Sequence, residues 1–251
     1  MVSKLIFLCA AGFVAAAVDA IAGGGGIISL PAFLLAGVSP HMSLGTNKFA
    51  STCSSCTSSI KYAQSGKVNF KLLKILIPFT FCGASLGVFC ALSITAEFLN
   101  KIVLVMLLFV GIYSLFSKTI GLKDNFKGIN KHNISLGIIL AFSLGFYDGF
   151  FGPGAGSFLI FGLIGIYGFD FINAGGNSKV LNFVSNVTSL VLFAVNGEIY
   201  YLYGIPAAIF MIFGARFGAK LALKRGAKLM KPVFVIMSLA VCAKLLYGMV
   251  K

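Results

Sequence analysis

The sequence has few acidic residues, two histidines and no tryptophan. Only six Asp and Glu stand against 20 Lys and Arg, and charged residues make up 10% of the 251 positions. A soluble domain carries about 25% charged residues, so this chain has too little charge to cover a globular surface in water. The hydrophobic share of 59% and the mean hydropathy of +1.00 predict an all-α polytopic membrane protein.

Residues that bind metal ions or catalyse reactions are equally scarce. Cys53 and Cys56 form a C-x-x-C pair, but no second cysteine pair or histidine completes a set of metal ligands. We therefore expect free, buried thiols, no metal, no cofactor and no enzyme activity. The chain also lacks the phosphate-binding sequence G-x-x-x-x-G-K-[ST]. A proton gradient or a substrate gradient is therefore the expected driving force for any transport.

The basic residues lie in short loops between apolar stretches, and they give a formal net charge of +14. The positive-inside rule accounts for such loops, because cytoplasmic loops of membrane proteins are rich in Lys and Arg. A second interpretation is an electrostatic field that attracts anionic substrates. Basic residues divided among short loops argue against a nucleic-acid partner.

The two halves of the chain repeat one another, which indicates the duplication of one unit. The matched positions are Asp19 with Asp148, Thr46, Asn47 and Lys48 with Asn177, Ser178 and Lys179, Gly66 with Gly197, and Gly83 and Gly87 with Gly214 and Gly218. We predict a first transmembrane repeat at 1–117, a basic cytoplasmic linker at 118–132 and a second transmembrane repeat at 133–251. Gly83 and Gly87 are four residues apart, as are Gly214 and Gly218, and this spacing is typical of close helix packing.

Each half contains five apolar segments, and the second is too short to span a bilayer. The segments are 4–21, 26–38, 44–63, 70–94 and 98–117 in the first half, and 133–149, 154–168, 175–196, 199–222 and 230–249 in the second. A glycine cluster precedes each short segment. Short, glycine-interrupted segments at matching positions of two halves indicate the midplane binding site of a transporter.

Loop charges predict that the two repeats are inverted. Lysines gather between the third and fourth segments of the first half, whereas the equivalent junction of the second half has only Glu198. In the second half the basic residues follow the fourth segment instead. By the positive-inside rule, equivalent loops then lie on opposite sides of the membrane. Three full crossings and a single crossing with a re-entrant pair both remain open for the first three segments.

The glycine clusters are candidate anion sites. Gly24, Gly25 and Gly26 in the first half and Gly154 and Gly156 in the second precede a short helix. The backbone N–H groups at a helix N-terminus, together with the helix dipole, favour a negative ligand. Tight turns or close helix contacts are the alternative explanation for these glycines.

A polar stripe on the third segment of each half is the second candidate. Its residues recur at helical spacing behind an intramembrane lysine. The candidate binding residues are Thr46, Asn47, Lys48, Ser51 and Ser55 in the first half, and Asn177, Lys179, Asn182 and Asn186 in the second. One cation surrounded by hydroxyl and amide groups suits an oxyanion. Hydrogen bonds between helices are the alternative, since small polar residues often make them in membranes.

Asp19 and Asp148 are acids within the apolar stretches. An unpaired carboxylate at the bilayer centre costs roughly 3 kcal/mol on insertion scales, so each one should be paired, protonated or in a wet cavity. Lys48 and Lys179 are the expected partners. A proton-coupling role and a purely structural salt bridge are equally open.

Four segments in order carry a resemblance to a known family. They are DAIAGGGGIISLPAFLLAGVSP, GTNKFAS, GFYDGFFGPGAGSF and NSKVLNFVSN. Over nearly its whole length the chain resembles the TauE/SafE family of sulfite exporters, also called the toluene sulfonate uptake permease family, and within it a subgroup described as probable membrane transporter proteins. The resemblance implies a multi-pass protein of a prokaryotic plasma membrane and a small sulfur-containing anion as substrate.

Together these features predict a secondary transporter of a small anion, such as sulfite or an organosulfonate, with a midplane site between the repeats. A passive anion channel is the alternative. The expected partners are the anionic substrate and membrane lipid, with protons as a candidate co-substrate and a homo-oligomer left open.

Overall fold

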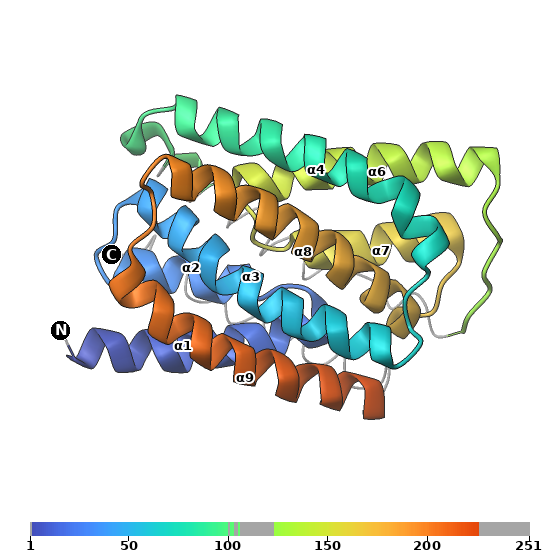
Figure 1. The fold of residues 1–251 in the computed structure, drawn as a ribbon, viewed down its shortest axis with the longest axis horizontal. Helices are drawn as coiled ribbons and strands as arrows, with labels where there is room; N and C mark the ends of the chain where they lie inside the picture. Colours follow the sequence, from blue (N-terminus) through green and yellow to red (C-terminus); the bar gives the residue numbers. More distant parts are fainter. Residues whose placement is uncertain (1, 100, 103–104, 106–122, 226–251) are drawn as a thin grey trace.

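The computed structural model describes residues 2–99, 101–102, 105 and 123–225, and within them all regular secondary structure is helical (Figure 1). The helices are α1 (Val2–Ala22), α2 (Gly26–Leu35), α3 (Pro40–Gln64), α4 (Phe70–Ser93), α6 (Lys131–Phe150), α7 (Ala155–Tyr167), α8 (Phe171–Val195) and α9 (Tyr201–Arg225). They match the first four predicted segments of each half. Most of the predicted segment at 98–117 and all of that at 230–249 lie outside the described residues.

Five of these helices are long and apolar enough to cross a membrane, namely α1, α4, α6, α8 and α9. Helix α3 is equally long, with 25 residues, but its serines and threonines make it more polar. Helices α2 and α7 have only 10 and 13 residues. The prediction of an all-α, multi-pass membrane protein with two short helices is confirmed.

Side-chain caps and glycines set several helix boundaries. Asn69, Asn130 and Asp170 each accept a hydrogen bond from a backbone N–H of the first helical turn that follows, which satisfies a donor that has no intrahelical partner. Helices α3 and α8 end alike, because each is followed two residues later by a glycine, Gly66 or Gly197, with φ of 67° or 72°. Glycine reaches this left-handed conformation without steric cost.

The two halves pack through equivalent helix pairs. Helix α4 packs along α6, and α9 packs along α1, so the fourth helix of each half contacts the first helix of the other half. A Cβ atom on Gly87 would overlap the carbonyl oxygen of Phe146, and one on Gly218 would overlap that of Ala17. Gly83 and Gly214 make the same kind of approach. The predicted packing role of these glycines is confirmed.

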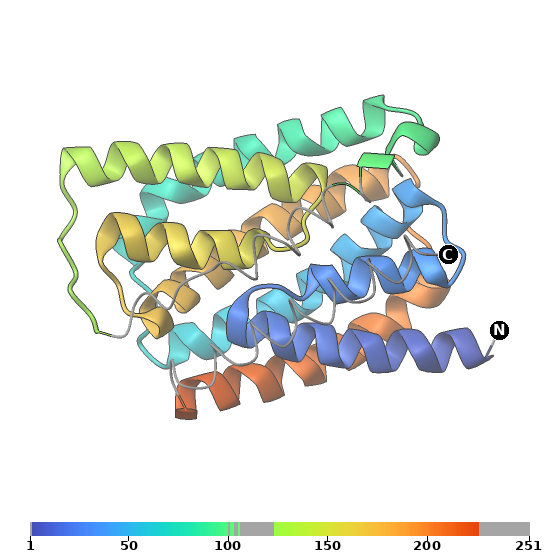
Figure 2. The ribbon, with the colours of Figure 1, turned by 180° about the vertical axis from the view of Figure 1, so that it is seen from behind.

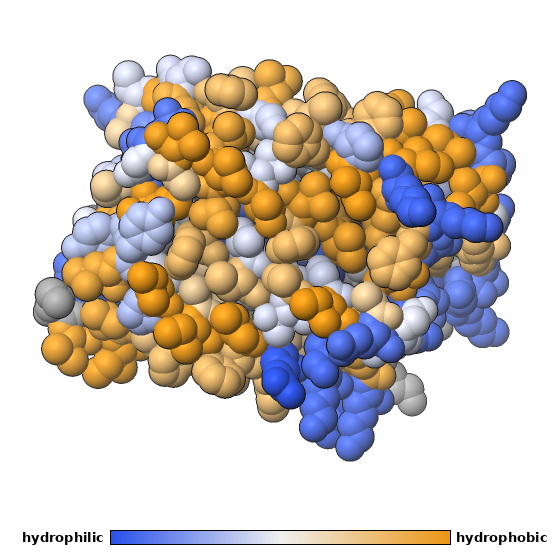
Figure 3. Space-filling model, in the orientation of Figure 1, coloured by the Kyte–Doolittle hydropathy of each residue, from blue (hydrophilic) through white to orange (hydrophobic). Residues whose placement is uncertain are grey.

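Equivalent helices of the two halves run in opposite directions along the long axis (Figures 1 and 2). The short helices α2 and α7 both start near the middle of that axis and end at opposite ends. The α3–α4 loop, the described part of the linker and the end of α9 share one end, where hydrophilic side chains gather beside an apolar middle (Figure 3). Which end faces the cytoplasm stays a prediction.

The cysteines depart in part from the expectation of buried thiols. All those in the described residues are free, and Cys9 is buried, but Cys82 is exposed on α4. Cys53, Cys56 and Cys90 are partly exposed, so the expectation of burial holds for Cys9 alone among the described cysteines and is wrong for Cys82. A thiol behaves as a small apolar group, which an apolar helix surface tolerates. Cys242 lies outside the described residues.

Candidate functional site

The two glycine breaks meet at the centre of the molecule. The backbone N–H of Ser157, in the first turn of α7, donates to the carbonyl oxygen of Gly23 at 3.0 Å. The Ser157 hydroxyl donates to the Ala22 carbonyl at 2.7 Å. Gly23 and Gly152, at matching positions of the repeat, have φ of 83° and 101°. The turns that precede α2 and α7 therefore form one continuous wall.

Two ion pairs cross between the halves beside this wall. Lys48 Nζ on α3 lies 2.9 Å from Asp148 Oδ1 on α6. Lys179 Nζ on α8 lies 2.7 Å from Asp19 Oδ2 on α1. Both lysines are buried, with 2% and 0% exposure. The prediction that these lysines are the partners of the aspartates is confirmed, and the pairing is reciprocal between the repeats.

Asp148 sits in a dense hydrogen-bond network. Its Oδ2 atom accepts from the Ser185 hydroxyl and, at 3.5 Å, from Asn182 Nδ2. Lys48 also donates to Asn186 Oδ1 at 3.2 Å. These contacts leave Asp148 with a partner on α3 and two on α8.

The repeat axis runs through this network. Asn186 Nδ2 lies 3.4 Å from the Ser55 hydroxyl oxygen, and the two residues occupy equivalent positions of the repeat. A residue that contacts its own repeat equivalent lies on the approximate two-fold axis that relates the halves. The predicted stripes on α3 and α8 therefore face one another at the centre.

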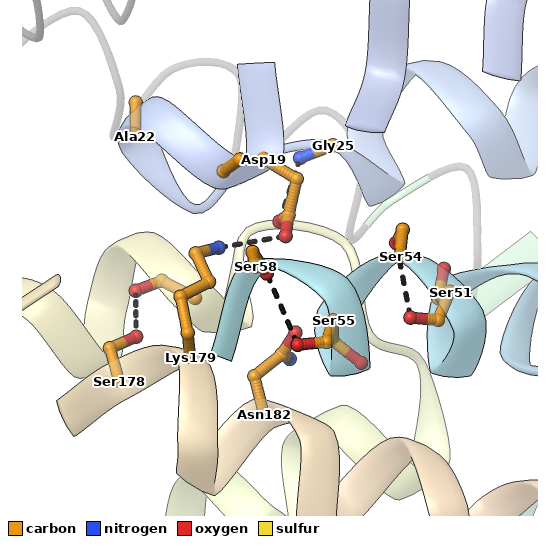
Figure 4. Close-up of polar contacts among 12 residues, drawn as sticks. Asp19, Ala22, Gly25, Ser51, Ser54, Ser55, Ser58, Ser178, Lys179 and Asn182 are labelled. Carbon is orange, nitrogen blue, oxygen red and sulfur yellow. Dashed lines mark hydrogen bonds and ion pairs between the residues drawn. The ribbon is translucent and has the colours of Figure 1, made fainter. Parts of the chain in front are cut away.

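Asp19 occupies the kind of anion site that the sequence predicts at a helix start. The backbone N–H of Gly25, which precedes α2, donates to Asp19 Oδ1 at 3.3 Å, while Lys179 holds Oδ2. The Asp19 and Lys179 side chains point toward one another from α1 and α8 (Figure 4). A carboxylate of the protein itself thus lies between an ammonium group and a helix N-terminus.

A small cavity lies among these groups, with a volume of about 20 Å³. Its walls are formed by Asp19, Gly23, Gly25, Gly26, Asn47, Lys48, Ser51, Ser54, Asp148, Gly152, Gly156, Asn182, Asn186 and Met211. This volume is enough for about one water molecule. An anion larger than water therefore requires the cavity to widen.

Asn47 is the polar wall residue with an unsatisfied group. It is 4% exposed, and its Oδ1 atom has no hydrogen-bond partner among the described residues. Buried polar atoms normally find a partner, so this oxygen is free to accept a hydrogen bond from a water molecule or from a ligand that carries an N–H or O–H group. Within the described residues, no three His, Cys, Asp or Glu side chains lie together as metal ligands.

Some predicted site residues do not line the cavity. Gly24, Ser55, Gly154 and Lys179 lie next to wall residues in the chain or in space, with Lys179 behind Asp19. Their contact with a substrate stays a prediction.

Thr46 and Asn177 also lie away from the cavity, and both bind a backbone N–H group. The Thr46 hydroxyl accepts from the Tyr200 N–H, and Asn177 Oδ1 accepts from the Asn69 N–H, each at 2.9 Å. These equivalent bonds tie α3 to the start of α9, and α8 to the start of α4. Their observed role is to anchor helix ends.

Four wall residues were missing from the sequence-based set. Gly23 and Gly152 match one another in the repeat, and Ser54 follows Ser51 at i, i+3 on α3, so the pattern held a signal for these three. No sequence signal marked Met211 of α9, because an apolar residue in an apolar helix looks like its neighbours in the sequence.

Comparison with known proteins identifies the family of this chain. The family model "Sulfite exporter TauE/SafE" matches residues 8–245. The chain is 36% identical to a "Probable membrane transporter protein" of Haemophilus influenzae, over 98% of this chain and 96% of that protein. It is 34% identical to the "Probable membrane transporter protein YfcA" of Escherichia coli strain K12, over 98% of this chain and 92% of that protein. No solved structure matches the chain significantly. The chain therefore belongs to the TauE/SafE sulfite exporter family of membrane transporters.

Proposed function

We propose that this protein is a secondary transporter of a small sulfur-containing oxyanion, such as sulfite or an organosulfonate. The observation that carries the proposal is the pair of buried lysines, each neutralised by an aspartate of the other half, beside a cavity at two broken helices. A buried ammonium needs an anionic partner. An oxyanion that enters the cavity can take the place of a carboxylate.

The cavity walls suit such a substrate. Ser51 and Ser54 supply hydroxyl groups, and Asn47 and Asn182 supply side-chain amides whose N–H groups can donate to an anion. Sulfite and sulfonates present several acceptor oxygens around one centre, so they accept hydrogen bonds from several directions, as a carboxylate does. Charge-assisted hydrogen bonds are stronger than neutral ones, which favours an anion over a neutral solute.

The ion pairs also connect substrate binding to movement of the halves. Each pair joins one half to the other across the centre. A substrate that replaces one carboxylate removes such a connection, which allows the packed halves to shift. Alternating access in many transporters arises from movement of one repeat against the other around a fixed site.

The direct test is uptake of radiolabelled sulfite and sulfoacetate into vesicles that contain the purified protein. We expect saturable uptake and counterflow, together with a higher melting temperature in the preferred anion, since ligand binding to the folded state stabilises it. Acetate and benzoate serve as controls. Ohmic current without counterflow would mean a channel, and the absence of an effect with every sulfur oxyanion would refute the substrate class.

The inverted arrangement of the repeats in the membrane belongs to the same proposal. Lys67 and Glu198 are a matched pair, because they hold equivalent positions after Gly66 and Gly197 and both are half-buried. In a protein stripped of its native cysteines, we expect Lys67→Cys to react with a membrane-impermeant reagent from the cytoplasmic side and Glu198→Cys from the opposite side. Reaction of both from one side would show that the repeats are not inverted.

A further inference from the structure

The two ion pairs match in sequence but not in surroundings. The Asp19 side chain is 17% exposed, whereas that of Asp148 is 4% exposed. Both line the cavity, so water or a proton that enters it reaches the Asp19 carboxylate more readily. The repeat therefore contains one accessible and one enclosed carboxylate.

The difference in exposure between the two aspartates arises from residues that lie one and two helical turns after Lys48 on α3 and after Lys179 on α8. On α8, Asn182 and Ser185 both donate to Asp148. Their repeat equivalents on α3 are Ser51 and Ser54, which line the cavity without a bond to Asp19. Ser54 donates to the Ser51 carbonyl oxygen at 3.1 Å (Figure 4), as Ser185 also does to the Asn182 carbonyl oxygen at 3.1 Å. The smaller side chain of Ser51 thus leaves cavity space where the second half has Asn182 as a donor for its carboxylate.

Asp19 consequently depends on two donors, Lys179 Nζ and the Gly25 N–H. Both donors also suit an external oxyanion, since one is an ammonium and the other lies at a helix N-terminus. The hydroxyls of Ser51 and Ser54 line the same cavity. The Asp19 carboxylate and a substrate anion therefore compete for one set of donors.

We propose that Asp19 binds the transported proton. Its protonation frees the Lys179 ammonium group to pair with the substrate anion, so that proton and anion cross the membrane together in the same direction. This inference rests on the proposed function. The proton adds to a carboxylate oxygen of Asp19, Lys179 stays an ammonium, and an oxygen of the anion replaces the carboxylate beside it. No bond within the anion is made or broken.

The charges around Asp19 make the two binding events cooperative. Lys179 on α8 contacts it, Lys48 and Tyr62 on α3 interact with it electrostatically, and Asp148 on α6 lines the same cavity. Helices α2, α7 and α9 contribute only glycines and one methionine to the walls. Two lysines and two aspartates balance, so one added proton leaves one uncompensated positive charge, which an anion neutralises.

Asp148 has the opposite role in this scheme. Three side chains donate to it, and its lysine has a further acceptor in Asn186. Displacement by a substrate would break all these contacts together. The Lys48–Asp148 pair therefore holds the halves in position, while the Lys179–Asp19 pair exchanges partners.

The test compares Asp19→Asn with Asp148→Asn in purified protein, with sulfoacetate as the ligand, because sulfite itself binds a proton near neutral pH. For the wild-type protein we expect anion affinity to rise about tenfold for each unit that the pH falls, over the range in which Asp19 is ionised without the anion and protonated with it, as one linked proton requires. Asparagine cannot be protonated in this range. Asp19→Asn should therefore lose this slope, whereas any folded Asp148→Asn protein should keep it.

Proton movement gives a second readout that needs no variant. Sulfoacetate uptake by wild-type vesicles should acidify their interior, measured with a trapped pH dye, and Asp19→Glu should retain this acidification. Anion uptake without acidification, or an Asp19→Asn protein that keeps the pH slope, would overturn the assignment of Asp19. Failure of the wild-type protein to bind or transport any sulfur oxyanion would instead refute the proposed function.

Discussion

Replacing Lys48 with methionine should abolish anion transport and destabilise the protein, and adding Asp148→Asn should restore stability but not transport. Lys48 and Asp148 are 2.9 Å apart with side-chain exposures of 2% and 4%. Removing one partner of a buried ion pair leaves an uncompensated charge and costs ~3–5 kcal/mol, whereas replacing both partners is often nearly neutral. The double variant balances its charges but lacks the ion pair that joins α3 to α6 across the two halves, so transport should stay lost.

The measurements are the melting temperature in detergent and sulfite uptake in vesicles. The Lys101–Glu97 pair provides a matched control, because its atoms are 3.2 Å apart while its side chains are 70% and 84% exposed. Lys101→Met should change stability little, since exposed pairs contribute about 0–1 kcal/mol. A Lys48→Met protein that melts and transports like the wild type would contradict the importance of the buried pair.

Replacing Gly23 with alanine should be far more damaging than the same change at Gly66. Both glycines have positive φ, at 83° and 67°, so each substitution carries the left-handed cost of roughly 1–2 kcal/mol. The two differ in their surroundings. A Cβ atom on Gly23 would overlap the backbone of Gly156 and Ser157, whereas one on Gly66 meets nothing within 4 Å.

The difference between these two variants isolates the contact between the glycine breaks. We expect Gly66→Ala to fold and transport sulfite, with a modestly lower melting temperature. Gly23→Ala should push α7 away from the turn that precedes α2, which disrupts the cavity wall and abolishes uptake. Equal melting temperatures and equal uptake for the two variants would show that the breaks need not touch.

The sequence predicted most of the helices, because hydrophobic length and glycine clusters are local properties. It also identified the four charged residues, since an ion in an apolar stretch stands out without any structure. It could not assign Asp19 to Lys179 and Asp148 to Lys48. That assignment depends on which first helix lies beside the third helix of each half, which is a long-range property of the packing.

Local pattern also failed to separate two kinds of polar residue on the same helix. Thr46 and Asn47 are adjacent, yet Thr46 anchors the backbone of Tyr200 while Asn47 lines the cavity. Adjacent residues on a helix point in directions about a quarter turn apart. The direction that faces the centre is set by the packing of α3 against α8 and α9.

The unequal surroundings of the two aspartates could be predicted in part from the sequence. The pairs Ser51 with Asn182 and Ser54 with Ser185 show that the first half carries the smaller side chain at one position. The sequence does not show whether the space beside the smaller side chain stays open or is filled by a neighbour. That depends on the packing of other helices, since Met211 of α9 also helps to form the cavity.

A structure of the protein with bound sulfite or sulfoacetate tests the location of the site most directly. We expect the anion's oxygens between Lys179 Nζ and the Gly25 N–H, with Asp19 moved away from Lys179 and the Lys48–Asp148 pair intact. An anion bound at saturation elsewhere in the protein, with both ion pairs unchanged, would contradict the assignment of the substrate to this cavity.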